Sequence, residues 1–406
     1  MSLDPFGLPI VVDVAPGNRA DDPLYGPAYK RAKGIIGGTG KLVVGDCKMS
    51  AKETRATIAA GEDYYLTPLA YAKAEPELLD ELLTPWYGRE SECQQIFLPE
   101  ELPTGGSAPL EENAIAHGFE VERTHHYTID GKEISWTERL LVIRSKAYVK
   151  TMQEGIKNRL TKAEEALSNL TSSGRGKKQF RDEASLKLAI EQIQKKYRAH
   201  GLLKYTIEAE VTERKIRKYR DNPARVERTI RFQLHLERDE EAIDKALFQA
   251  GWRIYATNSP KHSLSLSDAV LAYRDQYVEE NIFRRLHGKF LSITPLYIQR
   301  DDHAKGLFHL LTIAARLLAL GDFQAKKALA EQKRELAGIF DGSDKRSTAT
   351  PTTERLLKAF KGIDLIFVHI PGQESQAILT PLTPVQQDIL ALLGLHTSLY
   401  TDLIHP

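Results

Sequence analysis

Residues 273–287, with the sequence YRDQYVEENIFRRLH, form the stretch on which the fold assignment of this chain depends. Nothing in it breaks a helix before Gly288, and Ser267 stands ahead of it as an N-cap residue, so we predict one helix over the whole stretch. At helical spacing the polar side chains share one face: Tyr273, Tyr277, Glu280, Arg284 and His287. The apolar side chains fall largely on another side: Ile282, Phe283, Leu286 and Phe290.

This polar face places an acid between aromatic and basic side chains, and it allows two interpretations. One is a charged, solvent-exposed helix surface above an apolar underside, which is the more common arrangement. The other is a carboxylate that binds a metal ion beside a phosphate backbone, because hard cations prefer oxygen ligands and basic side chains contact phosphates. The stretch taken alone leaves both interpretations open.

The composition is that of a globular protein with one locally basic segment. A chain of 406 residues suffices for two or more domains, and 42% hydrophobic and 27% charged residues are ordinary values. The net charge is only +1, but residues 150–231 contain 21 Lys and Arg against 11 Asp and Glu, a local net charge of +10. This segment favours a polyanionic partner such as DNA. A solvated helical surface rich in ion pairs would have the same composition.

Several features lead us to expect a cytoplasmic protein without membrane association. Two cysteines, Cys47 and Cys93, cannot by themselves build a disulfide framework or a zinc site, which favours a reducing compartment. The N-terminus lacks the charged-then-apolar pattern of a signal sequence. The most apolar helix candidate, residues 306–320, is too short to span a bilayer and contains His309 and Arg316. We expect it to be a buried core helix.

The first 75 residues alternate between strand and helix signals, which implies an α/β core. Strands are expected at residues 7–14, 41–46 and 64–69, and helices at residues 23–33 and 50–60. Ser50 and Glu53 have the spacing of a capping box for the second helix. Asp46 ends a Val-rich strand, where open α/β sheets commonly carry ligands, although an Asp after a strand is more often a turn former or a cap.

The rest of the chain is predicted to contain a mixed insertion followed by a return to the core. Strands are expected at residues 120–127, 136–144, 205–211, 229–236 and 252–256, and helices at residues 146–170, 182–200 and 240–250. Asp130-Gly131 predicts a hairpin between the first two of these strands. The first two helices predict a basic helical hairpin. Near the end, Thr383-Pro384 and Gln386 indicate a helix that begins with a capping box.

The residues around Glu280 match the pattern of a known family. The matching positions are Tyr277, Glu280, Phe283, Arg285-Leu286, Gly288, Pro295-Leu296-Tyr297 and Arg300-Asp301-Asp302, with Asp46 on an upstream strand. In order and spacing they resemble the DDE-type insertion-sequence transposases of the IS-four-like superfamily, in the branch with a long insertion. Within the family's glutamate-helix signature, Gln276 and His287 stand where the family has Arg and Lys.

The resemblance implies an α/β fold with a ribonuclease-H-like core, interrupted by a large mixed strand-and-helix insertion and followed by a helical C-terminal tail. It assigns residues 1–75 to the first part of the core and residues 76–250 to the insertion with the basic helical hairpin. Residues 251–325 become the second part of the core, with the glutamate helix, and residues 326–406 the tail.

The chemistry that the resemblance implies is metal-dependent phosphodiester hydrolysis and strand transfer. Asp46 and Glu280 would be the catalytic residues and the ligands of Mg²⁺ or Mn²⁺, and we expect their carboxylates to lie about 5–8 Å apart. The residues expected to bind DNA are Lys48, Tyr273, Tyr277, Arg284, Arg285, His287 and Lys289, together with the basic insertion. The expected partners are transposon ends and target DNA, bound by a homodimer.

One of the family's three acids has no counterpart in this sequence. Asp4 and Asp13 do not stand in its sequence context, so we expect the opening strands of the core and their Asp to be absent from this chain. The leading hypothesis is a DNA transposase with an incomplete catalytic triad. The alternatives are a catalytically inactive, truncated remnant that only binds DNA or partner subunits, and an unrelated α/β nuclease.

Overall fold

The computed structural model describes residues 1–69, 76–102, 110–172, 179–180, 182–216, 225–288, 290–293, 297–343, 345–372 and 376–404. The chain divides into two compact units, and the fold is mixed α/β, as predicted. Unit 1 contains Met1–Lys41, Ala60–Asp63 and Ala272–Pro406. Unit 2 contains Leu42–Ala59 and Tyr64–Leu271. The domain boundaries expected near residues 75, 250 and 325 stay predictions.

Unit 2 is built on a mixed sheet. In the described part of the chain its six strands follow the order β3-β4-β10-β7-β6-β5. They are β3 (Leu42–Val44), β4 (Tyr64–Pro68), β10 (Trp252–Thr257), β7 (Lys132–Ser145), β6 (Ala116–Ile129) and β5 (Gln94–Ile96). Within this sheet β3 and β4 pair in parallel, and the other neighbouring strands pair antiparallel. Helix α2 (Lys52–Ala60) joins the parallel pair, because parallel neighbours need a crossover connection.

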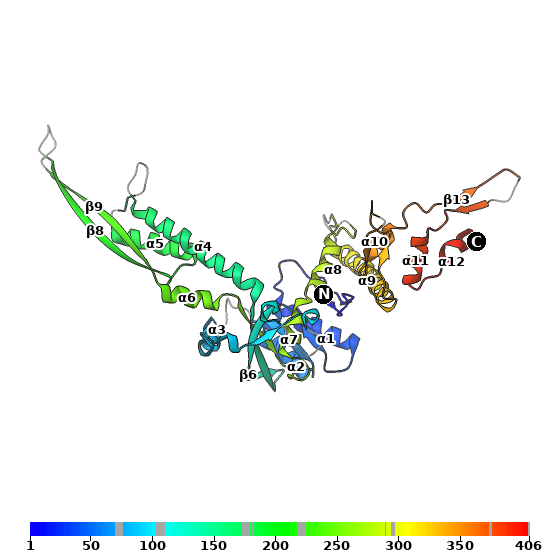
Figure 1. The fold of residues 1–406 in the computed structure, drawn as a ribbon, viewed down its shortest axis with the longest axis horizontal. Helices are drawn as coiled ribbons and strands as arrows, with labels where there is room; N and C mark the ends of the chain where they lie inside the picture. Colours follow the sequence, from blue (N-terminus) through cyan, green and yellow to red (C-terminus); the bar gives the residue numbers. More distant parts are fainter. Residues whose placement is uncertain are drawn as a thin grey trace. The chain divides into compact units, whose positions relative to one another are not determined.

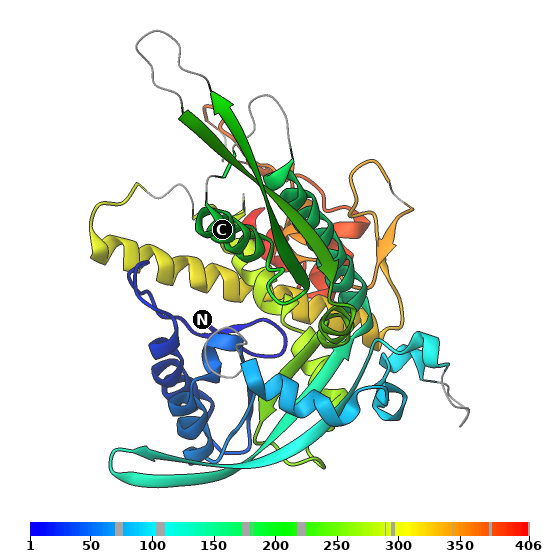
Figure 2. The same cartoon turned by 90° about the vertical axis from the view of Figure 1, so that its left-hand side faces the viewer.

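The hairpin of β6 and β7 confirms the turn predicted at Asp130-Gly131. Ile129 pairs with Lys132 across this two-residue turn, and φ is 49° at Asp130 and 78° at Gly131. Positive φ at both turn positions is what a type I′ hairpin turn requires, and Asp-Gly adopts it readily. Figure 2 shows the resulting long cyan hairpin.

The predicted helical hairpin of the insertion is also present. Helices α4 (Lys146–Thr171) and α5 (Glu183–Tyr197) lie along the antiparallel ribbon of β8 (Leu203–Ile216) and β9 (Arg225–Arg238), as Figure 1 shows. Their shared core contains Leu160, Ala163, Leu167, Leu186, Ile190, Leu203 and Ile243. The other helical elements of unit 2 are η2 (Cys47–Ser50), α3 (Pro76–Leu83), η3 (Thr84–Trp86), η4 (Glu90–Glu92), η5 (Pro99–Glu101), η6 (Glu111–Asn113) and α6 (Glu240–Gln249).

Unit 1 is mainly helical but also contains short strands. Its elements are β1 (Ser2–Leu3), β2 (Pro9–Val11), η1 (Asp22–Leu24), α1 (Tyr25–Ile36), α8 (Tyr277–His287), α9 (Asp301–Glu331), β11 (Leu336–Ala337), β12 (Ser347–Thr348), α10 (Thr353–Lys358), β13 (Leu365–Val368), β14 (Gln376–Leu379), α11 (Pro384–Leu392), α12 (Ser398–Thr401) and η7 (Asp402–Ile404). We expected a helical tail, and this prediction is wrong in part, because the tail also contains the strand pairs β11–β12 and β13–β14. The capping box at the start of α11 is confirmed.

The prediction of one helix over residues 273–287 is wrong. The structure instead has α7 (Leu266–Arg274) and α8, with a turn at Asp275-Gln276 between them. Ser265, rather than Ser267, accepts a hydrogen bond at the start of α7, from the backbone N of Asp268 at 3.1 Å. No helix-breaking residue stands at the turn, so helix propensity alone does not explain where α7 ends.

The burial of this stretch also differs in part from the prediction. Ile282 and Leu286 are buried in a core of unit 1, as their spacing predicted. Phe283 and Phe290 are 40% and 56% exposed, although we placed them on the apolar side. The buried side of α8 is therefore narrower than an amphipathic helix pattern alone indicates.

The expectation of a fully buried helix at residues 306–320 is wrong. Helix α9 is longer than predicted, and it buries one face while Leu310, Leu317 and other apolar side chains stay exposed on the opposite face. Among the described helices, α9 is long and apolar enough to cross a membrane, judged by length and composition only. One such helix is weak evidence for membrane insertion, because core helices of soluble proteins pass the same test.

Candidate functional site

Asp46 lies at the carboxyl end of β3, as predicted, and its turn is fixed by the neighbouring residues. Its Oδ1 accepts a hydrogen bond from the backbone N of Lys48 at 2.9 Å, which makes Asp46 the N-cap of η2. Its backbone O accepts from Oγ1 of Thr67 on β4 at 2.7 Å. Gly45 precedes it because a Cβ there would lie 2.6 Å from the sulfur of Met49. The half-buried Asp46 carboxylate therefore has a defined position.

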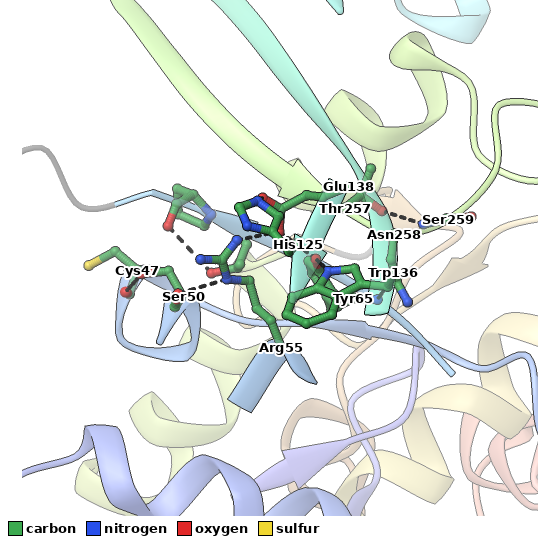
Figure 3. Close-up of polar contacts among 12 residues, drawn as sticks. Cys47, Ser50, Arg55, Tyr65, His125, Trp136, Glu138, Thr257, Asn258 and Ser259 are labelled. Atoms are coloured by element: carbon green, nitrogen blue, oxygen red, sulfur yellow. Dashed lines mark hydrogen bonds and ion pairs between the residues drawn. The ribbon is translucent and has the colours of Figure 1, made fainter. Parts of the chain in front are cut away.

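Beneath this turn lies a buried polar network that the sequence analysis missed (Figure 3). Arg55 of α2 donates through Nε to the backbone O of Ser50, at 2.9 Å, and through Nη1 to Oε1 of Glu138 on β7. The Tyr65 hydroxyl donates to the same Oε1, and Nε1 of Trp136 donates to the Tyr65 oxygen at 2.8 Å. The network thus connects η2, which Asp46 caps, to the centre of the sheet.

The network is almost inaccessible to solvent, which sets its electrostatics. Glu138 is 1% and Arg55 is 5% exposed, and the ring nitrogen Nε2 of His125 on β6 lies 2.7 Å from Oε2 of Glu138. Burial and the neighbouring Glu138 carboxylate raise the pKa of Tyr65 well above its usual range, so this hydroxyl stays a donor. The two hydrogen bonds that Oε1 of Glu138 accepts offset part of the cost of desolvating this buried carboxylate.

A second buried arginine holds the loop between β10 and α7. Nη1 of Arg139 donates to the backbone O of Ser259 at 2.8 Å and to that of Leu264 at 2.9 Å, and its Nε donates to Glu120 at 3.0 Å. Burial raises the pKa of Glu120, but hydrogen bonds from Lys261 and Arg139 outweigh it and leave that pKa below its usual value. The chain therefore enters α7 from a fixed position.

Glu280 lies in the first turn of α8, where its side chain is exposed. Tyr277, Arg284 and His287 of the same helix are exposed as well, which confirms this part of the predicted polar face. Arg284 donates to Oδ1 of Asn281 at 3.0 Å. Tyr273 lies half-buried on α7, so it belongs to a different helix from Glu280.

Arg285, which we expected to bind DNA, has a structural position within unit 1. Its Nη2 lies 2.7 Å from Oδ2 of Asp322 on α9, and its Nε lies 2.7 Å from Oε1 of Glu354 on α10. Asp322 also accepts from the backbone N of Thr353 at 2.7 Å. A contact between Arg285 and a phosphate would have to compete with these two carboxylates.

The predicted site residues are divided between the two units. Asp46 and Lys48 belong to unit 2, whereas Glu280 and the α8 residues belong to unit 1, so the separation of the two acids stays a prediction. Lys289 lies outside the described residues. In the part of the chain that the structure describes, no three His, Cys, Asp or Glu side chains are grouped to hold a metal ion.

Asp63 forms a second buried polar group, located in unit 1, that the sequence analysis also missed. Its Oδ2 accepts from the Tyr29 hydroxyl and lies 2.7 Å from Nζ of Lys33, both on α1, and its Oδ1 accepts from the backbone N of Lys41 at 2.9 Å. Burial raises the pKa of Asp63, but the hydrogen bonds from Lys33, Tyr29 and Lys41 outweigh it, so the pKa is lower than usual. The group anchors α1.

We expect Asp63→Asn to lower the free energy of unfolding by about 2–4 kcal/mol at pH 7, because it leaves the charge of Lys33 without its partner. The pKa of Asp63 is lower in the folded protein than in the unfolded chain. The ionised carboxylate therefore stabilises the fold fully at pH values above the unfolded-state pKa, and this stabilisation is lost as the pH falls through the folded-state pKa. Urea unfolding at pH 7 and pH 3 should therefore show a smaller difference between variant and wild type at pH 3. Glu62→Gln, at an exposed neighbouring position, is the control and should change stability little.

Comparison with known proteins does not assign this chain to a family. A scan against protein-family models gives no match. A search of curated proteins gives no significant match. Any assignment of function therefore depends on the residues and on their geometry.

Proposed function

We propose that this chain is a DNA-binding protein of the DDE transposase type, in which Asp46 and Glu280 are the acids for metal-dependent phosphodiester chemistry. The observation that supports it best is the position of Asp46, at the carboxyl end of one strand of a parallel pair and held there by hydrogen bonds on both sides. Ligand-binding acids in open α/β sheets commonly occupy such ends. The ribonuclease-H-like core and the strand-transfer activity belong to this proposal.

The surroundings of Glu280 support the same proposal. An exposed carboxylate in the first turn of α8 is followed on that helix by the exposed cations Arg284 and, when protonated, His287. A DNA phosphate is attracted to such cations, and the Glu280 carboxylate would be one ligand for a metal ion if one were bound. Tyr277, 58% exposed on the same helix, offers a ring against which sugar or base can pack.

Neither unit alone provides enough proposed carboxylate ligands to bind Mg²⁺ or Mn²⁺. Asp46 offers one carboxylate in unit 2 and already uses Oδ1 to cap η2, and Glu280 offers one in unit 1. Two-metal phosphodiester chemistry needs more oxygen ligands than one carboxylate provides. Asp46 and Glu280 are therefore proposed only as ligands of such an ion.

One observation favours a second candidate, a protein that binds DNA or partner subunits without cutting. It is the lack of any cluster of three metal-ligating side chains among the described residues. A chain of this kind keeps the basic helical hairpin of the insertion and its affinity for phosphates, and loses only the hydrolysis. Binding and cleavage measured on the same DNA separate the two candidates.

The basic insertion should carry most of the affinity for DNA. We expect the triple variant Lys157→Gln, Lys162→Gln and Lys195→Gln to weaken binding of a duplex, since each lost phosphate contact reduces counterion release. The slope of log K against log salt concentration should become shallower by up to about 2.7, which is about 0.9 for each of the three contacts. Fluorescence anisotropy at several salt concentrations measures both quantities.

A matched variant controls for net charge alone. Lys333, Lys345 and Lys361 are exposed lysines of unit 1, and changing all three to Gln removes the same charge as the triple variant in the insertion. This control should leave the salt slope nearly unchanged. Equal effects of both variants, or no DNA binding by the wild-type chain, would contradict a binding role for the insertion.

A further inference from the structure

Helix α9 has an exposed apolar face that the structure of unit 1 leaves uncovered. Leu310, Ile313, Leu317 and Leu320 are 62%, 52%, 63% and 47% exposed, and we call these four residues the α9 stripe. The opposite face of the helix is buried in unit 1 through Thr312, Ala315, Leu318, Ala319, Ala325 and Leu329. The buried face holds the helix in place, so the stripe faces outward from a fixed helix, which Figure 2 shows in yellow as one continuous element.

The spacing within the α9 stripe indicates what can cover it. The intervals of three, four and three residues are those of a coiled-coil seam, in which apolar side chains alternate between the a and d positions. From Leu310 to Leu320 the stripe extends roughly 15 Å along the helix axis, at about 1.5 Å per residue. The next positions of the same seam are His303 and Gly306 on one side and Gln324 and Lys327 on the other, so polar or small residues limit its length.

We propose that the α9 stripe pairs two copies of this chain, with their α9 helices antiparallel. A two-fold axis at the level of residue 315 places Leu310 of one copy opposite Leu320 of the other, and Ile313 opposite Leu317. Every large aliphatic side chain of the stripe then meets another one. An antiparallel pair also brings opposite ends of the two helix dipoles together.

The charges at the ends of the stripe favour the antiparallel direction. The same axis places Lys327 of one copy beside Asp302 of the other, whereas a parallel pair would place Asp302 against Asp302 and Lys327 against Lys327. Within one chain Asp302 lies 2.5 Å from Arg300, and Lys327 lies 4.0 Å from Glu331. Both are exposed ion pairs of small energy, so they can exchange partners in the dimer. This inference does not depend on the proposed phosphodiester chemistry.

A lipid surface fits the α9 stripe less well than a second helix. Arg316, between Ile313 and Leu317, donates to the backbone O of Pro9 at 2.7 Å and to that of Ile10 at 3.0 Å, which fixes α9 to β2. A helix held in this way by its folded unit cannot leave it to cross a bilayer. Binding of the stripe to a membrane surface is one outcome that the experiment below distinguishes.

Sedimentation velocity of the full chain, over a range of protein concentrations and without DNA, tests the proposal. We expect a monomer–dimer equilibrium whose dissociation constant rises at least about tenfold in the variant Leu310→Gln with Leu317→Gln, because buried apolar residues at an interface centre carry most of its affinity. The control is Leu188→Gln with Leu357→Gln, two exposed leucines outside the stripe that are 58% and 49% accessible. It should leave the constant unchanged, and circular dichroism checks that both variants fold.

A charge exchange tests the direction of the helices and does not alter the apolar residues. Lys327→Glu should weaken the dimer, and adding Asp302→Lys to the same chain should restore it, because the pair is then reversed. A chain that stays monomeric at all concentrations, or a dimer that is insensitive to the Leu310 and Leu317 changes, would overturn the proposal. Binding to phosphatidylcholine vesicles that those two changes abolish would instead assign the stripe to a membrane surface.

Discussion

Replacing Glu138 with Gln should lower the free energy of unfolding by about 3–5 kcal/mol, because breaking a buried ion pair leaves an uncompensated charge. The pair of Glu138 and Arg55 is nearly inaccessible to solvent, and the same carboxylate oxygen accepts from the Tyr65 hydroxyl. An amide cannot neutralise the Arg55 guanidinium, which would stay desolvated. Urea unfolding monitored by circular dichroism measures the loss.

Two further variants separate the buried pair from other effects of substitution. Glu133→Gln changes the same chemical group at an exposed position of β7 and should shift stability by less than about 0.5 kcal/mol. The double change Glu138→Leu with Arg55→Met should be less destabilising than Glu138→Gln alone, since no buried charge remains. A Glu138→Gln chain as stable as the wild type would show that solvent reaches this network.

Loss of the Asp46 or Glu280 carboxylate should lower the rate of any Mg²⁺-dependent cleavage of transposon-end DNA by at least about a thousandfold. The reason is that catalytic groups that act together cannot replace one another. We expect slow cleavage by the wild-type chain, because two-metal chemistry needs more oxygen ligands than the two proposed acids provide. Glu280→Gln should abolish whatever Mg²⁺-dependent cleavage the wild-type chain shows.

The matched control for this prediction is Glu279→Gln, which changes the preceding acid of the same helical turn and should leave cleavage nearly unchanged. Asp46→Asn should act like Glu280→Gln, and both variants should still bind DNA. Robust cleavage by the chain alone would show that it already contains a complete site, and Asp13 would then be the next residue to substitute. Binding without cleavage under every condition would favour the inactive candidate.

The sequence by itself determined those features whose cause is local. The turn between β6 and β7 depends on two residues, Asp130 and Gly131, that adopt positive φ readily, and it formed where predicted. The capping box at Thr383 and Gln386 depends on a three-residue spacing and formed as well. Asp46 lies just after β3 because Gly and Asp are turn-forming residues, and here they follow a short apolar run.

Only the tertiary structure decided the features that join residues far apart in the chain. Arg55 and Glu138 are separated by 83 positions, and neither residue type nor spacing indicates that a charged Arg and a charged Glu will be buried together. The turn that separates α7 from α8 has no helix-breaking residue, so helix propensity did not indicate it. The predicted face around Glu280 was correct only from Tyr277 onward for this reason.

Exposure of an apolar residue is likewise a tertiary property. The sequence gives α9 apolar residues on most sides, which is the pattern of a helix buried all around. The structure covers one side through Ala315 and Ala319 and leaves Leu310 and Leu317 in solvent. The periodicity of apolar residues in the sequence shows which side chains share a helix face. Whether that face is buried depends on how many neighbouring helices and strands pack against it, and this is a property of the whole fold.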